Sequence, residues 1–449
     1  MVTGDVLLIS VGLDKGAVLA LTLALSDRML DIKLIRQQPD LVRQAIVDKH
    51  IHLDLDALLS LDAQHRKSIT ELESLLKQRN ENAKAVPTAS PAERPVLIAH
   101  GRELGMQIER CKAEQLKTEQ ALRDLLLLVP QIPADDAPRG VSDADNIEVK
   151  RWGVPNPPSF APRDHVALLK LHGWAELDRI GRIAGSRSYA LRGLGALLEL
   201  SVLRYAADKL IQQGFVLMSV PAFAVEEAFV GSGHFPTGRA EAYHLEDAGK
   251  FIAGTSEVTL NYLHSGEILD ESELPMRYAG ISTCFRKEAG SAGRDVRGLI
   301  RVHQFQKVEQ YVICKNDPAE SARWHAHLLA TAEEVLQELE LPYRIVECCT
   351  GDMGPGKFRM HDIETWIPSE QTYRETHSCS SLHDWQARRS QLRYRNARGE
   401  VEFCHTLNNT AAATPRLLVP LLENHQQADG SIKLPAVLRP YLGGREVLS

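Results

Sequence analysis

The sequence predicts an α+β protein, in which an antiparallel β-sheet flanked by helices follows an N-terminal antiparallel coiled-coil hairpin. Two observations support this prediction. Residues 54–129 contain two long heptad patterns separated by prolines. The strands and helices expected after residue 165 do not alternate regularly, and neither GxGxxG after a strand nor GxxxxGK[ST] occurs. A doubly wound parallel sheet with a common nucleotide cradle is therefore not indicated.

Composition and charge narrow the class of protein. The chain has 449 residues, of which 44% are hydrophobic and 25% charged, as in soluble globular proteins with two or more domains. A net charge of −7 argues against bulk adsorption to nucleic acid or anionic membranes, but allows a local basic patch. Seven cysteines form no CxxC pair, so we expect a reducing, cytoplasmic location without disulfides or a structural zinc.

Residues 1–28 form an N-terminal extension. Its apolar stretch at 6–25 is interrupted by Asp14, Lys15 and Gly16, so it falls short of an uninterrupted membrane span of ~20 residues. It also lacks a basic flank and a cleavage site typical of a secretory signal. We expect the extension to be disordered or not native, with translation starting at Met29, and we expect no membrane association.

Residues 29–135 are predicted to form a helical arm. Leucines at 58, 61, 72 and 75 keep a coiled-coil spacing, with His65 and Ser68 as weak points, and Pro87, Pro91 and Pro95 end this run. A second run follows, with Leu97, Leu104, Ile108, Cys111, Leu122, Leu125 and Val129 on one seam, diluted by Gly101, Gln115 and Thr118. The two runs predict an antiparallel hairpin whose helices are each ~40–50 Å long.

The tip of this hairpin is locally basic. Glu81 and Glu93 are outnumbered there by Lys77, Arg79, Lys84, Arg94 and Arg102. This pattern fits contact with a phosphate backbone, and it also fits a solvated charged coiled coil.

A proline-rich, acidic stretch at 136–165 is predicted to be a linker to a domain at 166–449. In that domain, residues 197–212 predict a helix with Leu200, Leu203, Ala207 and Leu210/Ile211 on one face, followed by a strand at 215–220. Further helices are expected at 258–263, 324–338 and 415–426, strands at 343–348, 358–367 and 403–408, and a loop at 409–413. Pro415 suits the first helical position and Thr414 its cap.

Residues 284–309, CFRKEAGSAGRDVRGLIRVHQFQKVE, predict a hairpin with a glycine-rich loop. Arg286 and Glu288, two apart on a strand, would share a face, so that one meets a phosphate and the other accepts from an amino group. An ordinary surface ion pair on a solvated hairpin is the alternative. Elsewhere, Thr255 precedes Glu257 as a helix cap would, and Glu375 lies three residues before Ser378.

The motifs resemble those of bacterial-type seryl-tRNA synthetases, a family of class II aminoacyl-tRNA synthetases, from about Met29 to the C-terminus. The class signatures stand in order: a helix and strand ending at Pro221, FRKEAGSAGRDVRGLIRVHQF, and HTLNNTAAATPRLLVPLLENHQQADG. The features that resemble the serine-specific enzymes are GTSEVTL at 254–260, YRETHSCSSLHDWQARR at 373–389 and the helical hairpin.

The resemblance implies an ATP site with Arg286, Glu375 and Arg416 as catalytic residues. Arg286 would hold the α-phosphate, Arg416 the terminal phosphate, and Glu375 and Ser378 a Mg²⁺ ion. Glu288 and Val302 would face the adenine, and the full set of ATP-binding positions is Arg286, Lys287, Glu288, Val302, Glu375, Thr376, His377, Ser378 and Arg416.

Serine would be bound, by the same resemblance, by Thr255, Ser256, Glu257, Arg286, Glu309 and Thr410. The arm would grip the long variable arm of tRNA(Ser), and tRNA(Sec) would be a further substrate. The first motif implies a homodimer.

The third motif departs from the common NGSGLAVGR, because it reads NNTAAATPR. Thr410 keeps the hydroxyl of the usual serine, and some bacterial branches resemble this form. Two rival interpretations remain open: a relative that loads seryl-adenylate onto another carrier, and a non-catalytic tRNA-binding protein. His303 and His377 are expected to be structural hydrogen-bonders, Cys379 and Cys404 packing residues, and Arg388–Arg389 either an acceptor-end contact or a surface pair.

Overall fold

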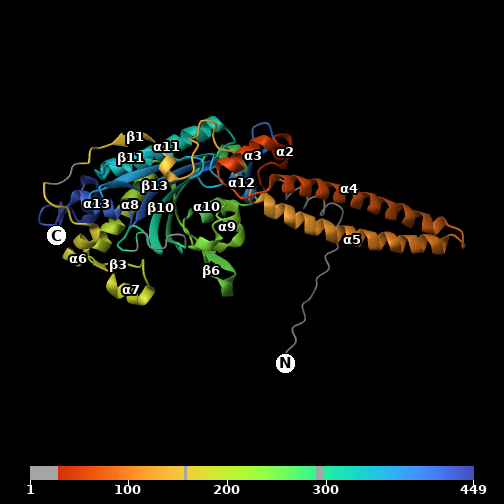
Figure 1. Ribbon diagram of the computed structural model, residues 1–449, viewed down its shortest axis with the longest axis horizontal. Coiled ribbons are helices and arrows are strands. Elements are labelled where there is room, and N and C mark those ends of the chain that lie inside the picture. Colours follow the sequence, from red (N-terminus) through yellow and green to blue (C-terminus); the bar gives the residue numbers. More distant parts are fainter. Residues whose placement is uncertain (1–28, 156–158, 290–294, 296) are drawn as a thin grey trace, which may run out of the picture. The chain divides into compact units, whose positions relative to one another are not determined.

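The computed structural model describes residues 29–155, 159–289, 295 and 297–449, and these fall into two compact units (Figure 1). One comprises residues 29–46 and 51–129, and the other comprises residues 47–50 and 130–449. The predictions for residues 1–28 and for the loop glycines at 290 and 293 lie outside the described residues.

The first unit is the predicted helical hairpin. Its long helices are α4 (Leu55–Ala85) and α5 (Arg94–Leu126), which run antiparallel and are joined through a short 3₁₀ turn, η1 (Val86–Thr88). Asp54 caps α4, because its side chain accepts a hydrogen bond from the Ala57 amide at 2.9 Å. Two short helices, α2 (Ile32–Gln37) and α3 (Pro39–Asp48), precede the hairpin.

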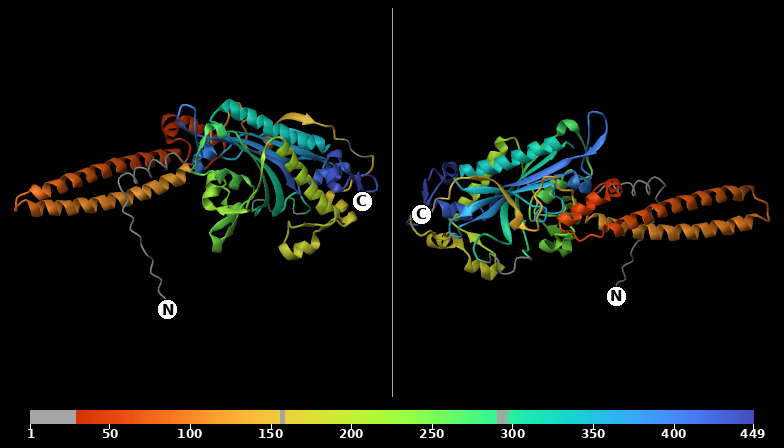
Figure 2. Two further views of the ribbon diagram at one scale, coloured as in Figure 1. Left: turned by 180° about the vertical axis from the view of Figure 1, so that it is seen from behind. Right: turned by 45° about the horizontal axis from the view of Figure 1, so that its top comes forward.

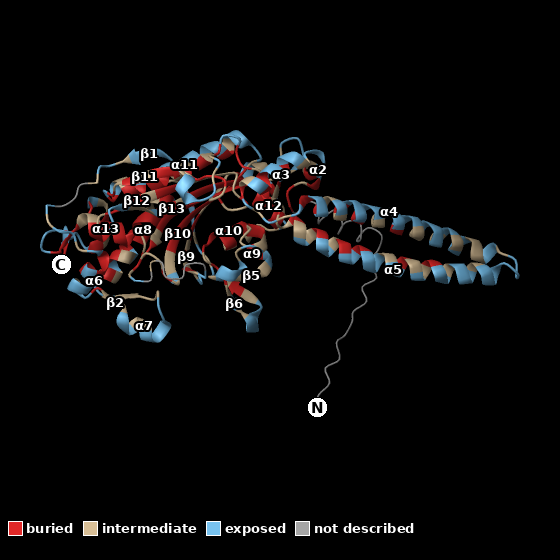
Figure 3. Ribbon diagram, in the orientation of Figure 1, coloured by how far each residue is buried: buried red, intermediate tan, exposed pale blue. Residues whose placement is uncertain are grey.

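The seam between α4 and α5 follows the heptad prediction. Leu58, Leu72, Leu104 and Ile108 are buried. Figure 3 shows short buried stretches along both helices among exposed and intermediate ones. The expected weak points at His65, Gln115 and Thr118 are also buried in the seam. At the open end of the hairpin, a larger apolar cluster forms around Met29, Ile35, Val42, Leu55, Leu122 and Leu126.

The second unit is built on the predicted antiparallel sheet. Its strand order is β1-β11-β12-β13-β16-β10-β9-β4, and only the β4–β9 pair is parallel. Figure 2 shows this unit with its sheet and helices from two further sides. The strands are β1 (Ile147–Trp152), β4 (Val216–Ser219), β9 (Met276–Phe285), β10 (Gln304–Cys314), β11 (Tyr343–Glu347), β12 (Arg359–Ile367), β13 (Thr372–His383) and β16 (His405–Thr414).

Helices cover both faces of this sheet. The long helices α8 (Leu194–Gln212) and α11 (Pro318–Glu338) lie on one face, where Gln310 and Asn409 donate to the Leu328 carbonyl of α11. The short helices α9 (Glu226–Ser232), α10 (Glu257–Tyr262) and α12 (Trp385–Ser390) lie at the other face. There Tyr311 donates to Asn261 of α10 or Gln386 of α12.

Smaller elements complete this unit. They are α6 (His165–His172), α7 (Asp178–Ala184) and α13 (Leu418–His425), together with the strand sets β2 (Ala175–Glu176) with β3 (Ala190–Leu191), β5 (Phe223–Val225) with β7 (Lys250–Ile252) and β6 (Tyr243–Leu245), β8 (Ile268–Asp270) with β14 (Arg393–Arg395) and β15 (Val401–Phe403), and β17 (Ile432–Lys433) with β18 (Val447–Leu448).

Three expectations for this unit are wrong in detail. The predicted linker at 136–165 contains β1, which pairs with β11 in the main sheet. Residues 409–413 are not a loop but part of β16, because small side chains fit a central strand with neighbours on both sides. The following helix begins at Leu418 rather than at Pro415, so Thr414 ends a strand and caps no helix.

The buried face of α8 also differs from the prediction. Leu203, Ala207 and Leu210 are buried as expected, but Leu200 is 61% exposed and Ile211 is 44% exposed. Leu198 and Val202 contribute to the core instead. The helix lies on the sheet rotated from the predicted face.

Candidate active site

Two β-bulges in the centre of the sheet decide which side chains reach the face that carries α9, α10 and α12. Between β12 and β13, Ile363 pairs with His377 but Glu364 pairs with Glu375, so Thr376 is the extra residue. Asp362 pairs with Ser378, and Asp362 and Glu364 share a face because side chains alternate along a strand. Their partners, Ser378 and Glu375, therefore share that face although they are three residues apart.

The second bulge lies between β10 and β16. Glu309 pairs with Thr410 and Val308 pairs with Ala412, so Ala411 is the extra residue. Lys307 and Glu309 point to the same face as Thr410.

Side chains from distant segments meet over this face. Two adjoining cavities have common lining residues, which are Arg286, Glu288, Arg301, Glu375 and Arg416. The first cavity is also lined by Val302, Lys307, Thr376 and Thr410, and the second extends to His234, Phe235 and Glu241. The sequence motifs at 286, 375 and 416 are thus brought together in one place.

The Arg416 guanidinium is fixed mainly by backbone carbonyls. Its Nε donates to the Ile300 oxygen at 3.1 Å and its Nη1 donates to the Glu375 oxygen at 3.2 Å. The Arg286 guanidinium lies 5.3 Å from the centre of the Phe305 ring and forms no ion pair within the described parts of the chain. Both guanidinium groups are thus positioned to bind an anion in the cavity.

Arg286 and Glu288 reach the cavity from a turn and not, as expected, from a strand. β9 ends at Phe285, and Glu288 has a positive φ of 53°. The Glu288 carboxylate accepts a hydrogen bond from Nη1 of Arg301 at 2.6 Å. A neighbouring arginine, rather than strand alternation, therefore orients Glu288.

An ion pair between Lys307 and Glu309 lies next to the first cavity. Lys307 also donates to the Thr255 hydroxyl at 3.3 Å, and that hydroxyl accepts from the Glu257 amide at 3.2 Å. The N-cap position of α10 is Ser256 and not, as expected, Thr255. Glu309 is only 1% exposed; burial raises its pKa, and Lys307 offsets part of the rise. Thr255 thus serves both the helix and the Lys307 network.

Glu257 is a second buried carboxylate in this region. It accepts hydrogen bonds from Gln386 at 2.7 Å and from Asn408 at 2.9 Å. Burial raises its pKa, but Lys357, His234, Lys307 and the Gln386 bond outweigh burial and leave the pKa below the ordinary value. Glu257 is therefore ionised at neutral pH.

Several predicted site residues do not line the two cavities. His377 is buried on the opposite face, where its Nε2 donates to the Ala411 carbonyl at 3.2 Å, and burial lowers its pKa to about 4. Lys287 is exposed beside the Tyr243 ring, and the buried Ser256 hydroxyl donates to the Gly280 carbonyl. Thr255 and Glu309 each contact Lys307, which lines the first cavity. Glu257 lies close enough for the charge of Lys307 to lower its pKa.

The donor set at Glu375 and Ser378 fits Mg²⁺. A carboxylate and a hydroxyl on one face of the sheet offer the hard oxygen ligands that Mg²⁺ prefers. Glu375 lines both cavities, whereas Ser378 lines neither.

Lys307, Arg301, Gln386 and Asn408 are site residues that the sequence reasoning missed. Lys307 had a usable signal, because it precedes Glu309 by two residues and so shares its face of the strand. Gln386 and Asn408 contact Glu257 from remote segments, and nothing in the local pattern marks them.

At the tip of the hairpin, all the predicted cations are exposed: Lys77, Arg79, Lys84, Arg94 and Arg102. Within the described residues none of them forms an ion pair. A search of the described helices finds none with the length and apolar character of a membrane span.

Two family descriptions match the chain. Residues 29–133 match "Seryl-tRNA synthetase N-terminal domain", and residues 243–425 match "tRNA synthetase class II core domain (G, H, P, S and T)". A serine–tRNA ligase from Deinococcus radiodurans is 54% identical over 420 residues, which cover 94% of this chain and 99% of that protein. A serine–tRNA ligase from Dictyoglomus thermophilum is 41% identical over 423 residues, covering 93% and 99% respectively.

Solved structures agree with these sequence matches. The seryl-tRNA synthetase from Pyrococcus horikoshii, solved as a complex with ATP, superimposes with a TM-score of 0.86 at 36% identity, covering 93% of this chain and 99% of that one. The fold class predicted from the sequence is confirmed. The similarity over more than nine-tenths of the chain, together with the convergence of the class II motifs on two adjoining cavities, shows that this chain belongs to the seryl-tRNA synthetase family.

Proposed function

We propose that this ATP-dependent serine–tRNA ligase works in two steps, first forming seryl-adenylate and then transferring serine to the 3′ end of tRNA(Ser). The observation that supports the proposal most directly is the convergence of Arg286, Glu375 and Arg416 on the same cavities from three separate motifs. The proposal includes tRNA(Sec) as a substrate, on the family resemblance alone.

In the first step the serine carboxylate attacks the α-phosphorus of ATP and pyrophosphate leaves. Negative charge accumulates on phosphate oxygens, so the protein needs fixed positive charge and no nucleophile of its own. Arg286 would contact the α-phosphate and Arg416 the terminal phosphate. Glu375 and Ser378 would hold a Mg²⁺ ion, which would supply further positive charge beside the phosphate oxygens.

Adenine recognition would fall to the turn after β9. Glu288 would accept from the adenine amino group, and Val302 would contact the ring. Support comes from the cavity lining and from Arg301, whose hydrogen bond to Glu288 orients the carboxylate.

Serine recognition would use the network around Lys307. The carboxylates of Glu257 and Glu309 would accept from the ammonium and hydroxyl groups of serine, with Thr410 opposite Glu309 on the neighbouring strand. Glycine and alanine lack the hydroxyl, so they would leave buried polar groups unpaired. Threonine would have to be excluded by size.

The helical arm would bind the tRNA, with the exposed cations at its tip contacting phosphates. We also propose a homodimer formed by the first motif, α8 and β4. Support comes from β4 being an edge strand of the sheet and from exposed apolar side chains on both elements, namely Leu197, Leu200, Val216 and Leu217. A monomeric mass in solution would contradict the dimer. The reduced cysteines fit our proposal of a cytoplasmic protein.

The decisive experiment is serine-dependent ATP–pyrophosphate exchange, which reports adenylate formation without tRNA. We expect exchange with serine, ATP and Mg²⁺, and loss of exchange in Arg286→Ala. Absence of exchange in the unmodified protein would refute the adenylate proposal.

A further inference from the structure

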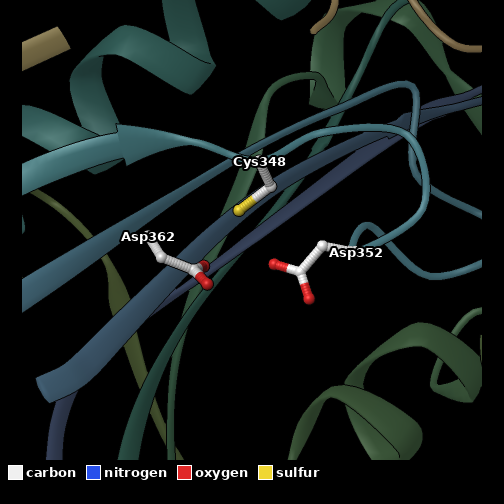
Figure 4. Close-up of side chains that lie close together, drawn as sticks. All are labelled: Cys348, Asp352 and Asp362. Atoms are coloured by element: carbon white, nitrogen blue, oxygen red, sulfur yellow. The ribbon is translucent and has the colours of Figure 1, made fainter. Parts of the chain in front are cut away.

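Three side chains with metal-binding chemistry meet beside the sheet. Cys348 follows β11, Asp362 lies in β12, and Asp352 lies in the segment that connects these strands. The sulfur and the nearest carboxylate oxygens all lie within 4.8 Å of one another. Figure 4 shows the Cys348 sulfur and both carboxylates turned toward a common space.

Burial makes this cluster unusual. Cys348 is fully buried and Asp362 is only 8% exposed, yet Oδ1 of Asp362 has no hydrogen-bond partner among the described residues. A buried carboxylate oxygen without a partner costs free energy unless a cation or a proton compensates it. Neither Asp352 nor Asp362 takes part in an ion pair within the described residues.

The arginine nearest in sequence to Asp362 already forms ion pairs with other carboxylates. Arg359, on the same strand as Asp362, pairs with Glu347 and Asp136. Asp352 is oriented by Asn146, whose amide donates to Oδ2 of Asp352 at 2.8 Å. The hydrogen bond leaves the other carboxylate oxygen of Asp352 available to a ligand.

We propose that Cys348, Asp352 and Asp362 bind a divalent cation of the zinc class. A thiolate among the donors favours zinc-like ions over Mg²⁺ and Ca²⁺, which prefer oxygen ligands alone. Donor atoms around a tetrahedral zinc ion lie roughly 3.5 Å apart, so small side-chain rotations would close the cluster around the ion. Three protein ligands leave a fourth position for water.

A bound cation would compensate the carboxylate charges of Asp352 and Asp362, which no ion pair among the described residues offsets. It would also fasten the segment between β11 and β12 to the sheet, because Cys348 and Asp352 lie in that segment and Asp362 lies in β12.

This site was missed in the sequence because zinc sites are recognised there by paired cysteines. Here one thiol acts with two carboxylates, and only the fold brings them together. The site is chemically different from Glu375 and Ser378, which offer oxygen alone, although Ser378 is the cross-strand partner of Asp362. A thiolate-to-metal charge-transfer band would therefore report a metal ion bound at Cys348 and not one bound at Glu375 and Ser378.

The neighbouring cysteine provides a matched control. Cys349 is also buried, but its sulfur donates to the Ser142 carbonyl at 3.2 Å and is not part of the cluster. Serine at 348 would remove the thiolate ligand, whereas serine at 349 can still donate to the same carbonyl.

The test uses the full-length protein, freed of metal with a chelator and titrated with Co²⁺ in the absence of nucleotide. We expect one equivalent to bind with a thiolate-to-cobalt charge-transfer band, which Zn²⁺ then displaces. The band should be lost in Cys348→Ser and in Asp362→Asn, and retained in Cys349→Ser. Zn²⁺ should raise the Tm of the unmodified protein and of Cys349→Ser only.

No charge-transfer band in the unmodified protein would overturn the proposal, whatever the variants do. A band that persists in a folded Cys348→Ser protein, or one that disappears equally in Cys349→Ser, would also overturn it. Metal binding is measured without nucleotide, so its result is independent of whether the protein forms seryl-adenylate.

Discussion

Nη1 of Arg416 lies 3.6 Å from Oε2 of Glu375, and the same guanidinium also donates to the backbone carbonyl of Glu375. Because the backbone carbonyls of Glu375 and Ile300 hold the arginine in place, its charge does not depend on the Glu375 carboxylate for orientation. The carboxylate is half-exposed and can bind a cation while the guanidinium binds an anion. Opposite charges are thus presented side by side, as a magnesium-bound triphosphate requires.

Arg416→Lys should impair adenylate formation although it keeps the charge. Lysine cannot reproduce the fork that donates simultaneously to the Ile300 and Glu375 carbonyls. We expect kcat/KM in ATP–pyrophosphate exchange to fall about 10²-fold or more. The exposed Arg398 provides the control, because Arg398→Lys should leave exchange unchanged. Near-normal exchange in Arg416→Lys would mean that charge alone suffices.

Lys307→Met should destabilise the protein, because it leaves the Glu309 carboxylate buried without its cation. Breaking such a pair costs about 3–5 kcal/mol. The double variant Lys307→Met/Glu309→Gln should recover part of this loss, since no buried charge remains. Chemical denaturation of the four proteins in the cycle measures the coupling. A double variant less stable than Lys307→Met would contradict the assignment.

Low pH should reduce the free energy of unfolding of the second unit, partly because the unfolded state protonates His377 more readily than the folded state does. Burial lowers the pKa of His377 to about 4 in the folded protein, while the unfolded value is about 6.5. The unfolded state therefore binds more protons between these values, so the contribution of this residue is complete above pH ~6.5 and falls as pH drops toward 4.

His377→Gln should accordingly flatten the dependence of unfolding free energy on pH in this window, by up to about 1.4 kcal/mol per pH unit. Denaturant titrations between pH 7 and pH 4 give the slope. His244→Gln, at an exposed position on β6, serves as the comparison. An unchanged slope in His377→Gln would show that another group is responsible.

Removing residues 77–102 should separate adenylate formation from tRNA charging. This segment contains the exposed cations of the tip, and none of the residues that line the cavities. We expect normal ATP–pyrophosphate exchange and a severe loss of tRNA charging.

A finer version replaces Lys77, Arg79, Lys84, Arg94 and Arg102 with glutamine. The logarithm of the tRNA association constant falls linearly with the logarithm of the salt concentration. Each lost phosphate contact should make this slope shallower by about one. Replacing Glu81 and Glu93 with glutamine is the control, since it removes charge of the opposite sign. Unchanged charging in the deletion protein would refute the role of the tip.

The parts of the fold that could be predicted are those encoded by local patterns. Leu58, Leu72, Leu104 and Ile108 form the coiled-coil seam because heptad spacing places them on one stripe. The cavity residues Arg286, Glu375 and Arg416 were found through motifs rather than through periodicity. Their roles toward ATP remain predictions, while their convergence is a property of the structure.

The errors arise where tertiary packing decides. Residues 409–413 have small side chains, which are typical of loops, but a central strand packed on both faces also accommodates small side chains. The prolines on both sides of residues 147–152 favour a linker, although Ile147 and Val149 alternate with Glu148 and Lys150 as in a strand. Gln386 and Asn408 support Glu257 across more than a hundred residues of sequence, which no local pattern records.

The extra residues at Thr376 and Ala411 change which positions of these two strands face the same side. Glu375 and Ser378 share a face although they are three residues apart, and so do Thr410 and Ala413. Deleting Thr376 or Ala411 would leave each pair two residues apart, and a regular pleat would again place them on one face. A homologue one residue shorter at either point can therefore present the same pair of side chains from a strand without a bulge.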